Sequence, residues 1–315
     1  RSDLRAFVRQ IRAADADVYH CVQASLGAYL AQRAMPDRAQ VVECVDPRDW
    51  NDWLIDFRLP THSAARLIPS FVYFGTRPAR LSVRRADAVQ VPARFLQAKV
   101  QRLYGLGTCP QFAPMPFDAP GTVTKSATPL VIFVGRLVPR KRPEIVLELA
   151  RQFPAVRFMI VGDESGRGYG SELRRQAAAL PNVIFSGFID QMTDARLFDH
   201  LGEAWILVNT AAREGLPLTF IEAASHRCAI LSECDPDGYA SKFGYHVRDG
   251  DFASGLKCLL SDDAWRSAGE RAYTCVARDH APGNAGKIQL AIYADALARS
   301  AGRRSMTRAT RRWPV

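Results

Sequence analysis

The sequence has 315 residues, of which 48% are hydrophobic and 23% charged. This composition is typical of folded domains and excludes a disordered chain, a collagen-like repeat and a coiled coil. At roughly 100 to 200 residues per domain, the length allows two domains or one large one. No run of about 18 apolar residues predicts a membrane-spanning helix. The N-terminal segment lacks the order of a signal peptide, so secretion is not favoured.

The chain is basic, with a net charge of +10, and contains seven cysteines. The cysteines are far apart, without a C-x-x-C pair or a histidine at metal-ligand spacing, so we expect reduced thiols in a cytosolic chain. Six arginines and no acid lie in the last twenty residues. A basic tail favours contact with an anionic membrane surface or a nucleic acid, although a solvated chain end explains it equally well.

Short apolar runs rich in β-branched residues alternate with longer segments of helical period. This alternation is typical of parallel sheets covered by helices, so it predicts an α/β fold. The predicted strands cover residues 17–22, 41–45, 88–91, 130–134, 156–161, 183–186, 205–208 and 229–232. The predicted helices cover residues 1–13, 23–34, 94–104, 143–152, 171–180, 216–225 and 265–279.

A domain boundary is expected near residues 115–128, where Pro, Gly, Ser and Thr interrupt the apolar periodicity. Residues 1–122 are then a partial first domain and residues 123–282 a complete doubly wound domain, followed at 283–315 by a helix and a basic tail. The first domain has about four predicted strands and no initiator Met. We therefore expect its beginning to be missing.

The first candidate site follows the predicted strand 130–134, where Gly135 leads into a basic loop with Arg136 and Lys141. Open α/β sheets bind ligands at the carboxyl ends of their strands, and a glycine there allows close approach of a backbone or ligand. A guanidinium and an ammonium at this position suit a diphosphate. Taken alone, the segment is equally consistent with an ordinary exposed basic loop.

A second loop leads into a predicted helix with Pro217 near its start, where the missing N–H is harmless. The free backbone amides near Leu218 and Thr219 form a natural phosphate site. A carboxylate at Glu222 on this helix can accept two hydroxyls of a ribose or sugar. Glu214 in the loop can face another part of the same ligand, although two glutamates at this spacing also occur by chance.

Together these segments resemble the retaining GT-B glycosyltransferases of family 4, also called the group-1 glycosyltransferases. The resemblance covers about residues 129–260 and rests on four elements in the family's order. They are the G-R-L…K loop from Gly135 to Lys141, Ile160-Val161-Gly162-Asp163, the segment 183–188, and the E-x7-E element from Glu214 to Glu222. The resemblance implies two Rossmann-like doubly wound parallel-sheet domains, the first incomplete here, and sugar transfer from a nucleotide-diphosphate sugar to an acceptor hydroxyl with retained anomeric configuration.

The resemblance also implies roles for individual residues. The residues matching Arg136 and Lys141 hold the donor's diphosphate, beside Gly135 and the helix start. The glutamate matching Glu214 contacts the donor sugar and is the candidate catalytic residue, and the one matching Glu222 binds the ribose hydroxyls. The base is framed by the backbone near Gly187, Phe188 and Ile189.

The first half resembles the family's acceptor domain more weakly. Residues 16–20 look like the family's strand that ends in a histidine, which makes His20 a second candidate catalytic residue facing the acceptor. A histidine at a strand end is also commonly a polar cap. The glycine-rich loop that the family places after its first strand is absent, which puts the acceptor site and the activity in question.

The sequence departs from the family in two places beside the phosphate region. Arg142 stands where the family has a glycine after the donor-loop lysine, and residues 225–229 replace a small-Gly-x-Pro turn. We expect these changes to alter the choice of donor without abolishing the site. His226, in that turn, is interpreted as an exposed turn residue.

Other motifs are set aside. The glycines of residues 162–170 do not spell the dinucleotide fingerprint G-x-G-x-x-G, and the two D-x-D pairs beginning at Asp15 and Asp235 are interpreted as caps or turns rather than metal ligands. We expect no cofactor and no metal. Arg136, Lys141 and the helix start would stabilise the leaving diphosphate without one, so chelators are not expected to inhibit.

Two other classes of function stay open. One is a nucleotide-sugar epimerase or phosphorylase on the same plan, which would act without an added acceptor. The other is a non-catalytic nucleotide-sugar-binding scaffold, which would bind the donor without hydrolysis or transfer. The oligomeric state and the identities of base, sugar and acceptor are left open by the sequence.

The expected partners are a nucleotide-diphosphate sugar and a carbohydrate or lipid-linked acceptor. The basic tail and a predicted helix with Arg77, Arg80, Arg84 and Arg85 suggest a cytoplasmic protein that is peripheral on the anionic inner face of the membrane. Nucleic-acid binding is not expected, because the basic residues are not interleaved with aromatic ones.

Overall fold

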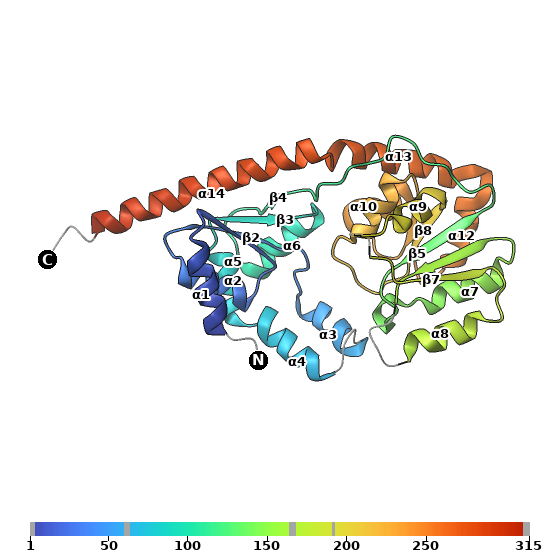
Figure 1. Ribbon diagram of the computed structural model, residues 1–315, viewed down its shortest axis with the longest axis horizontal. Helices are drawn as coiled ribbons and strands as arrows, with labels where there is room; N and C mark the ends of the chain where they lie inside the picture. The colour runs from blue at the N-terminus through green and yellow to red at the C-terminus, as the bar shows by residue number, and fades with distance from the viewer. Residues whose placement is uncertain (1–3, 60–63, 164–167, 191–192, 311–315) are drawn as a thin grey trace. The chain divides into compact units, whose positions relative to one another are not determined.

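The computed structural model describes residues 4–59, 64–163, 168–190 and 193–310 (Figure 1). The chain forms two compact units. Unit 1 consists of Arg1–Asp49, Ala65–Met115 and Gly283–Val315, and unit 2 of Trp50–Ala64 and Pro116–Pro282. Residues 50–64 thus group with the second unit and the C-terminal helix with the first, which differs from the expected division at residue 122.

Unit 1 is built on a four-stranded parallel sheet in the order β1-β2-β3-β4. Its strands are β1 (Val18–Val22), β2 (Ala39–Glu43), β3 (Ala88–Val91) and β4 (Gln111–Phe112). Its helices are α1 (Leu4–Ala14), α2 (Leu26–Ala34), α4 (Ala64–Phe74), α5 (Arg77–Arg84), α6 (Phe95–Tyr104) and α14 (Pro282–Thr310). Ile292 and Ala296 of α14 pack into the sheet core with Val41 and Ala88, so this part of α14 belongs to the core of unit 1.

Unit 2 is built on a six-stranded parallel sheet in the order β10-β9-β8-β5-β6-β7. Its strands are β5 (Leu130–Val134), β6 (Arg157–Val161), β7 (Val183–Gly187), β8 (Ile206–Asn209), β9 (Ala229–Ser232) and β10 (Gly244–His246). The strand order reverses at β5, which pairs with both β6 and β8. A reversal of this kind opens a crevice at the carboxyl ends of the strands, which is where such sheets bind ligands.

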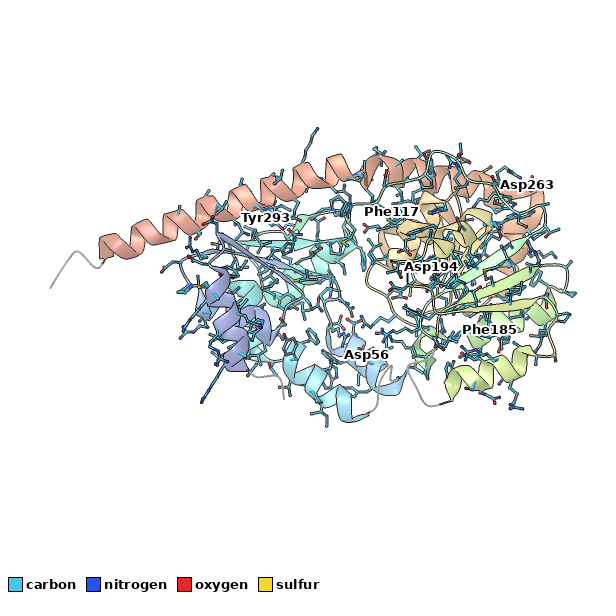
Figure 2. All side chains as sticks on the ribbon, in the orientation of Figure 1. Asp56, Phe117, Phe185, Asp194, Asp263 and Tyr293 are labelled. Atoms are coloured by element: carbon cyan, nitrogen blue, oxygen red, sulfur yellow. The ribbon has the colours of Figure 1, made fainter. Side chains whose placement is uncertain are left out.

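Helices of unit 2 cover both faces of this sheet (Figure 1). They are α7 (Glu144–Gln152), α8 (Tyr169–Ala177), α9 (Arg196–Glu203), α10 (Leu218–Ser225), α11 (Tyr239–Phe243), α12 (Phe252–Leu260) and α13 (Ala264–Asp279), with short 3₁₀ turns at Pro139–Lys141, Pro236–Gly238 and Ser261–Asp263. The helix α3 (Trp50–Arg58) also belongs to unit 2. In the core, Trp265 of α13 stacks on Trp205 with ring centroids 4.4 Å apart, and Phe158 is fully buried. The dense side-chain packing of the core is visible in Figure 2.

The predicted α/β architecture is confirmed, and three strands occupy the residues predicted for them, at 88–91, 130–134 and 229–232. Strands β4 and β10 were not predicted, because they have only two and three residues and therefore no readable period. Helices α3, α4, α9, α11 and α12 were not predicted either. The set-aside segment 162–170 includes residues 164–167, which lie outside the described residues.

Several smaller expectations can also be compared with the structure. All seven cysteines are free thiols. Asp235 caps α11, because its carboxylate accepts hydrogen bonds from the amides of Ala240 and Ser241 at 2.8 and 3.1 Å, and Asp15 pairs with Arg38. The interpretation of the pair at Asp235 as a cap or turn agrees with these contacts, whereas Asp15 and Asp17 both form ion pairs with Arg38. In the part of the chain that the structure describes, no helix is both long and apolar enough to cross a membrane.

The carboxyl edge of the unit 2 sheet depends on one glycine. Gly162 follows β6 with φ 141°, and a Cβ atom there would lie 1.9 Å from the carbonyl oxygen of Gly135, which follows β5. The amide of Gly135 donates to the carbonyl of Val161 at 3.0 Å, and that of Gly162 to Gly187 at 2.8 Å. The missing side chain of Gly162 therefore allows the ends of β5, β6 and β7 to approach one another. A Cβ atom at Gly135, in contrast, would make only ordinary van der Waals contacts, at 3.6 Å or more.

Replacing Gly162 by alanine should lower the free energy of unfolding by about 3 kcal/mol, because the new methyl group overlaps a backbone oxygen that cannot rotate away. Urea unfolding measures the loss. Gly250→Ala is the matched control, since Gly250 also has a positive φ, of 76°, but its nearest neighbouring atom would be 3.9 Å from the added Cβ. Equal losses in the two variants would contradict the steric argument.

Candidate functional site

A pocket of about 650 Å³ lies at the carboxyl edge of the unit 2 sheet. It is bounded by Val134 at the end of β5, Val161 at the end of β6 and Pro217 before α10. Most of the residues singled out from the sequence line it: Gly135, Arg136, Lys141, Phe188, Ile189, Glu214, Leu218, Thr219 and Glu222. Gly187 does not line the pocket, and its carbonyl instead accepts the hydrogen bond from Gly162.

Two loops form the polar side of this pocket, and hydrogen bonds join them directly. The first loop follows β5 and the second follows β8. The amide of Ala212 donates to the carbonyl of Arg140 at 3.0 Å, and the hydroxyl of Thr210 donates to the carbonyl of Lys141 at 2.6 Å. The backbones of the two loops are thus bonded to each other beside the residues that face the pocket.

The side chains of Lys141 and Glu214 form an ion pair across the two loops. Both side chains are mostly buried, and the amide of Asn209 donates a further hydrogen bond to the Glu214 carboxylate at 3.3 Å. Little water reaches the pair, so the attraction is stronger than in an exposed salt bridge. A negatively charged ligand that binds Lys141 therefore competes with Glu214.

Arg136 is the exposed cation of the pocket, and it makes no ion pair with any described residue. Partial burial and the nearby positive charge of Arg140 lower the pKa of Arg136, while Glu214 raises it. A guanidinium stays protonated at neutral pH despite such a shift. Arg136 is accordingly available for an anionic ligand.

Arg142 occupies the position where the family has a glycine, and its backbone is left-handed, with φ 47° and ψ 48°. This conformation explains why glycine is suited to the position. The Arg142 guanidinium donates to the carbonyl of Thr210 at 2.6 Å and forms an ion pair with Glu233, which follows β9. The arginine therefore ties the first loop to the ends of β8 and β9, which a glycine could not do.

Leu218 and Thr219 form the first turn of α10, which Pro217 precedes in extended conformation. The first amides of a helix have no intrahelical partner, and the helix dipole makes this end positive. Both residues line the pocket. The start of α10 thus lies beside the same pocket as Arg136 and Lys141, and phosphate binding there stays a prediction.

Glu222 lies one turn further along α10 and lines the pocket with a side chain that is almost entirely buried. Burial raises the pKa of Glu222 to about 7. At neutral pH the carboxyl group is therefore divided between its protonated and ionised forms. A raised pKa in a pocket is a common property of functional carboxylates.

The apolar side of the pocket is formed by Ile189, which is buried, and by Phe188, whose side chain is 70% exposed. Leu197 of α9 completes this side. Gly187, just before, has a positive φ of 72° with open space around the missing Cβ. An exposed phenylalanine beside an apolar wall suits stacking of a planar ligand group.

His20 belongs to unit 1 and does not line this pocket. It was expected at a strand end, which is wrong, because β1 continues to Val22. Its ring Nδ1 lies 2.9 Å from the hydroxyl of Tyr293 on α14, and its Nε2 lies 3.4 Å from the carboxylate of Glu43. Its expected role toward an acceptor stays a prediction.

The interpretation of His226 as an exposed turn residue is wrong, since the side chain is buried. Its Nδ1 lies 2.7 Å from the carbonyl of Glu222 and 3.0 Å from the hydroxyl of Ser225, and the ring stacks on Phe198. Burial lowers the pKa of His226, so the neutral form predominates at pH 7. The ring closes the end of α10 and holds the helix that carries Glu222.

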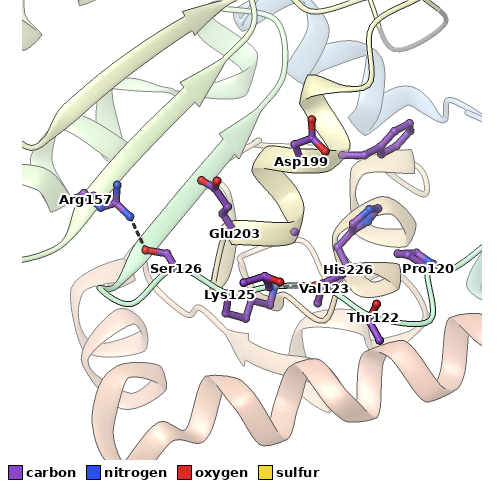
Figure 3. A pocket seen from close by; sticks show the side chains of 12 residues that line it. Pro120, Thr122, Val123, Lys125, Ser126, Arg157, Asp199, Glu203 and His226 are labelled. Atoms are coloured by element: carbon purple, nitrogen blue, oxygen red, sulfur yellow. Dashed lines mark hydrogen bonds between the residues drawn. The ribbon is translucent and has the colours of Figure 1, made fainter.

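A larger pocket of about 950 Å³ lies at the opposite edge of the same sheet (Figure 3). Ser126 before β5, Arg157 at the start of β6 and His226 before β9 line it, so it opens at the amino ends of the strands. The Lys125 ammonium donates to the carbonyls of Ala204 and His226 and is thereby committed to the protein. This edge carries none of the predicted ligand-binding residues.

Four charged residues that support the site were not predicted from the sequence. Arg140 and Arg213 directly precede Lys141 and Glu214, and both pair with Asp56 of α3, while Asp52 lies near Arg213. The only signal for them was the position of each arginine beside a motif residue. Among the described residues, no cluster of three or more His, Cys, Asp or Glu side chains could hold a metal ion.

Two units that each contain a parallel sheet covered by helices define this chain as an α/β protein with the GT-B fold. Comparison with solved structures agrees. TarM from S. aureus, solved in complex with fondaparinux, α-GlcNAc-glycerol and UDP, matches with a TM-score of 0.69 and 15% identity over 91% of this chain and 58% of TarM. HepE from Anabaena, solved with UDP and glucose, matches with a TM-score of 0.68 and 16% identity over 91% of this chain and 80% of HepE.

Sucrose-phosphate synthase from Thermosynechococcus elongatus matches with a TM-score of 0.66 and 20% identity over 97% of this chain and 78% of that enzyme. This chain therefore spans less than two thirds of TarM but most of the other two. Residues 117–244 match the model of the family of glycosyl transferases group 1. No curated protein matches the sequence.

The raised pKa of Glu222 predicts a pH-dependent stability. The folded state holds a proton up to about pH 7, whereas the unfolded chain releases it near 4.5, so this group lowers stability as pH rises from 4.5 to 7. Glu222→Gln, which stays neutral, should abolish this part of the loss and be more stable than the wild type at pH 8, by at most about 3 kcal/mol. Urea unfolding at pH 5 and pH 8 measures the free energy of unfolding of both proteins. An equal change in this free energy between the two pH values for the wild type and Glu222→Gln would refute the prediction.

Proposed function

We propose that this protein is a glycosyltransferase that moves a sugar from a nucleotide-diphosphate sugar to an acceptor hydroxyl. The observation that carries the proposal is the pocket of unit 2, which brings Arg136, Lys141 and the start of α10 together with two glutamates. The group 1 family match over residues 117–244 and the fold support it. The UDP bound in TarM and HepE makes a nucleoside diphosphate a reasonable leaving group to test first.

In the proposed reaction the diphosphate lies between Arg136, Lys141 and the amides of Leu218 and Thr219. Negative charge grows on this group as the bond to the sugar breaks, and fixed positive groups stabilise that charge without reorganising. Lys141 reaches the diphosphate by exchanging its contact with Glu214. Glu214 is then released to contact the donor sugar, so both partners of the ion pair gain a role when the donor binds.

Glu222 is proposed to accept hydrogen bonds from the ribose hydroxyls. Only the ionised carboxylate accepts from two hydroxyls, so donor affinity should rise with pH through the raised pKa of Glu222. The base would lie against Ile189 and Phe188. Retention of configuration and independence of metal follow from the family resemblance and from these cationic groups, and they are part of the proposal.

Two alternatives use the same pocket. A nucleotide-sugar epimerase or phosphorylase would act on the donor without an added acceptor, and a non-catalytic scaffold would bind the donor without turnover. Both remain proposals of lower rank, because the two glutamates and two cations of the pocket suit transfer from a diphosphate sugar. The acceptor is proposed to be a carbohydrate or a lipid-linked carbohydrate.

The proposal is tested by measuring melting temperature with UDP, GDP, ADP, CMP and NAD in the presence of a chelator. A ligand at about 100 times its dissociation constant stabilises the fold by roughly 2.7 kcal/mol. We expect one nucleoside diphosphate to raise the melting temperature, and Lys141→Ala and Glu222→Ala to abolish that shift. Arg151→Ala, an exposed change on α7, is the matched control and should keep the shift.

With the donor base known, the matching nucleotide sugars are incubated with carbohydrate acceptors, and the anomeric configuration of the product is read by NMR. Transfer that needs an acceptor and survives chelation supports the proposed function. Donor conversion without an acceptor would favour the epimerase, and binding without turnover would favour the scaffold. Absence of any thermal shift in a cooperatively melting protein would refute the donor site.

We also propose that unit 1 contacts an anionic membrane surface. Ile68, Val72 and Tyr73 of α4 are exposed apolar side chains, and α5 follows directly with the exposed Arg77 and Arg84. Apolar side chains beside basic ones are suited to the boundary between lipid headgroups and acyl chains. This surface is consistent with a lipid-linked acceptor.

Sedimentation with vesicles tests the membrane proposal. The protein should sediment with vesicles rich in anionic lipid at low salt and be released at high salt, because the attraction is screened. Exchanging Val72 and Arg84 for serine should weaken sedimentation severalfold without changing the melting temperature. Failure of the wild type to sediment would remove the proposal.

A further inference from the structure

Helix α3 presents two buried carboxylates to two buried arginines of unit 2. Asp52 and Asp56 are spaced by four residues, so they share one face of the helix. Both are almost inaccessible to solvent, and so are Arg140 and Arg213. Four buried charges of this kind sum to zero, and each one would be costly to bury without its partners.

One carboxylate of this cluster contacts both arginines. Oδ1 of Asp56 accepts a hydrogen bond from Nη1 of Arg140 at 2.9 Å, and Oδ2 of Asp56 lies 3.5 Å from Nη2 of Arg213. Asp52 lies further away, with its Oδ1 3.8 Å from Nε of Arg213. Asp56 is therefore the central member, and the two sides of its carboxylate are used by different arginines.

The two arginines belong to the two loops that form the polar side of the pocket. Arg140 directly precedes Lys141 in the loop after β5, and Arg213 directly precedes Glu214 in the loop after β8. Lys141 and Glu214 line the pocket. Arg140, which also borders the pocket, and Arg213 both contact Asp56 of α3. Asp56 thus spans the loops behind the Lys141–Glu214 ion pair.

We propose that Asp56 is a positioning residue of the donor pocket, assisted by Asp52, and that it sets the distance between Lys141 and Glu214 without touching the ligand. The inference rests on the proposed function, because it assigns Asp56 to the diphosphate part of that site. The contact crosses 84 residues of sequence, so α3, which lies outside the family match, becomes part of the donor machinery.

A merely structural role for α3 predicts a different result from a positioning role. If Asp56 only anchors the helix, its loss lowers stability but affects all parts of a bound nucleotide alike. If Asp56 positions Lys141 and Glu214, its loss weakens the diphosphate contacts and leaves those of ribose and base unchanged. The informative quantity is the affinity for a nucleoside diphosphate relative to the corresponding nucleoside.

The experiment compares the wild type with Asp56→Asn, which keeps the shape and removes the charge, and with Asp56→Glu, which restores the charge. Arg58→Gln is the matched control, an exposed charge change on the same helix. Binding of UDP and uridine, or of the pair for whichever base the melting panel identifies, is measured by calorimetry. We expect Asp56→Asn to weaken the diphosphate about tenfold with the nucleoside unchanged, and Asp56→Glu to recover part of the loss.

A second readout needs no ligand. Amide hydrogen exchange of residues 136–143 and 210–216 should be faster in Asp56→Asn than in the wild type or Arg58→Gln, because the loops are no longer held together. If Asp56→Asn does not fold, Asp52→Asn is used in its place. We expect this variant to speed loop exchange in the same way but by less, because Asp52 lies 3.8 Å from Arg213.

The outcomes separate the two proposals. Unchanged loop exchange and an unchanged affinity ratio in a folded Asp56→Asn protein would overturn the positioning role. If the wild type binds no nucleotide, the proposed function fails, while faster loop exchange in Asp56→Asn would still show that Asp56 holds these two loops.

Discussion

The pocket of unit 2 depends on holding two loops against each other at the carboxyl edge of a parallel sheet. Strands of such a sheet deliver their loops to one edge, but nothing in the sheet sets the spacing between loops that leave it in different directions. Here the hydrogen bonds from the Ala212 amide to the Arg140 carbonyl and from the Thr210 hydroxyl to the Lys141 carbonyl set that spacing. The Lys141–Glu214 ion pair and the Asp56 carboxylate act on either side of these bonds.

This arrangement balances the charges of the ligand-free pocket and leaves one cation exposed. Lys141 is paired with Glu214, and Arg142 with Glu233, whereas Arg136 points its charge toward solvent. An anionic ligand is attracted first by the exposed guanidinium and the start of α10. A contact of such a ligand with Lys141 would exchange one ion pair for another, so most of the desolvation of the lysine precedes binding.

Much of the pocket could be predicted from the sequence, because each predicted residue lies in a local pattern. Gly135, Arg136 and Lys141 directly follow an apolar strand, and Glu222 lies on a helix that a proline opens, so the rule that strand ends share an edge brings them together. The same patterns located most strands within two residues. Local periodicity is sufficient to predict an element wherever the residues that determine it are neighbours in sequence.

The remaining parts depend on contacts that no local pattern encodes. The pairing of Asp56 with Arg140 and the packing of α14 on the unit 1 sheet join segments far apart in the chain. In the sequence, Asp52 and Asp56 look like ordinary polar positions of a short helix. The burial of His226 could not be read either, since a histidine after a helix is normally exposed. It is buried because Phe198 of α9 stacks on its ring.

Two features beside the pocket work against stability, one directly after the lining residue Lys141 and one in the lining residue Glu222. Arg142 adopts a left-handed backbone that glycine would tolerate better, and Glu222 is a carboxyl group buried to the point that its pKa rises to about 7. Sequences normally avoid both, and exceptions are expected at functional sites. In each case a neighbouring contact explains how the feature persists. The Arg142 side chain bonds Thr210 and Glu233, and the helix of Glu222 is closed by the buried His226. The strain is thus offset by contacts inside unit 2 and does not depend on the rest of the chain.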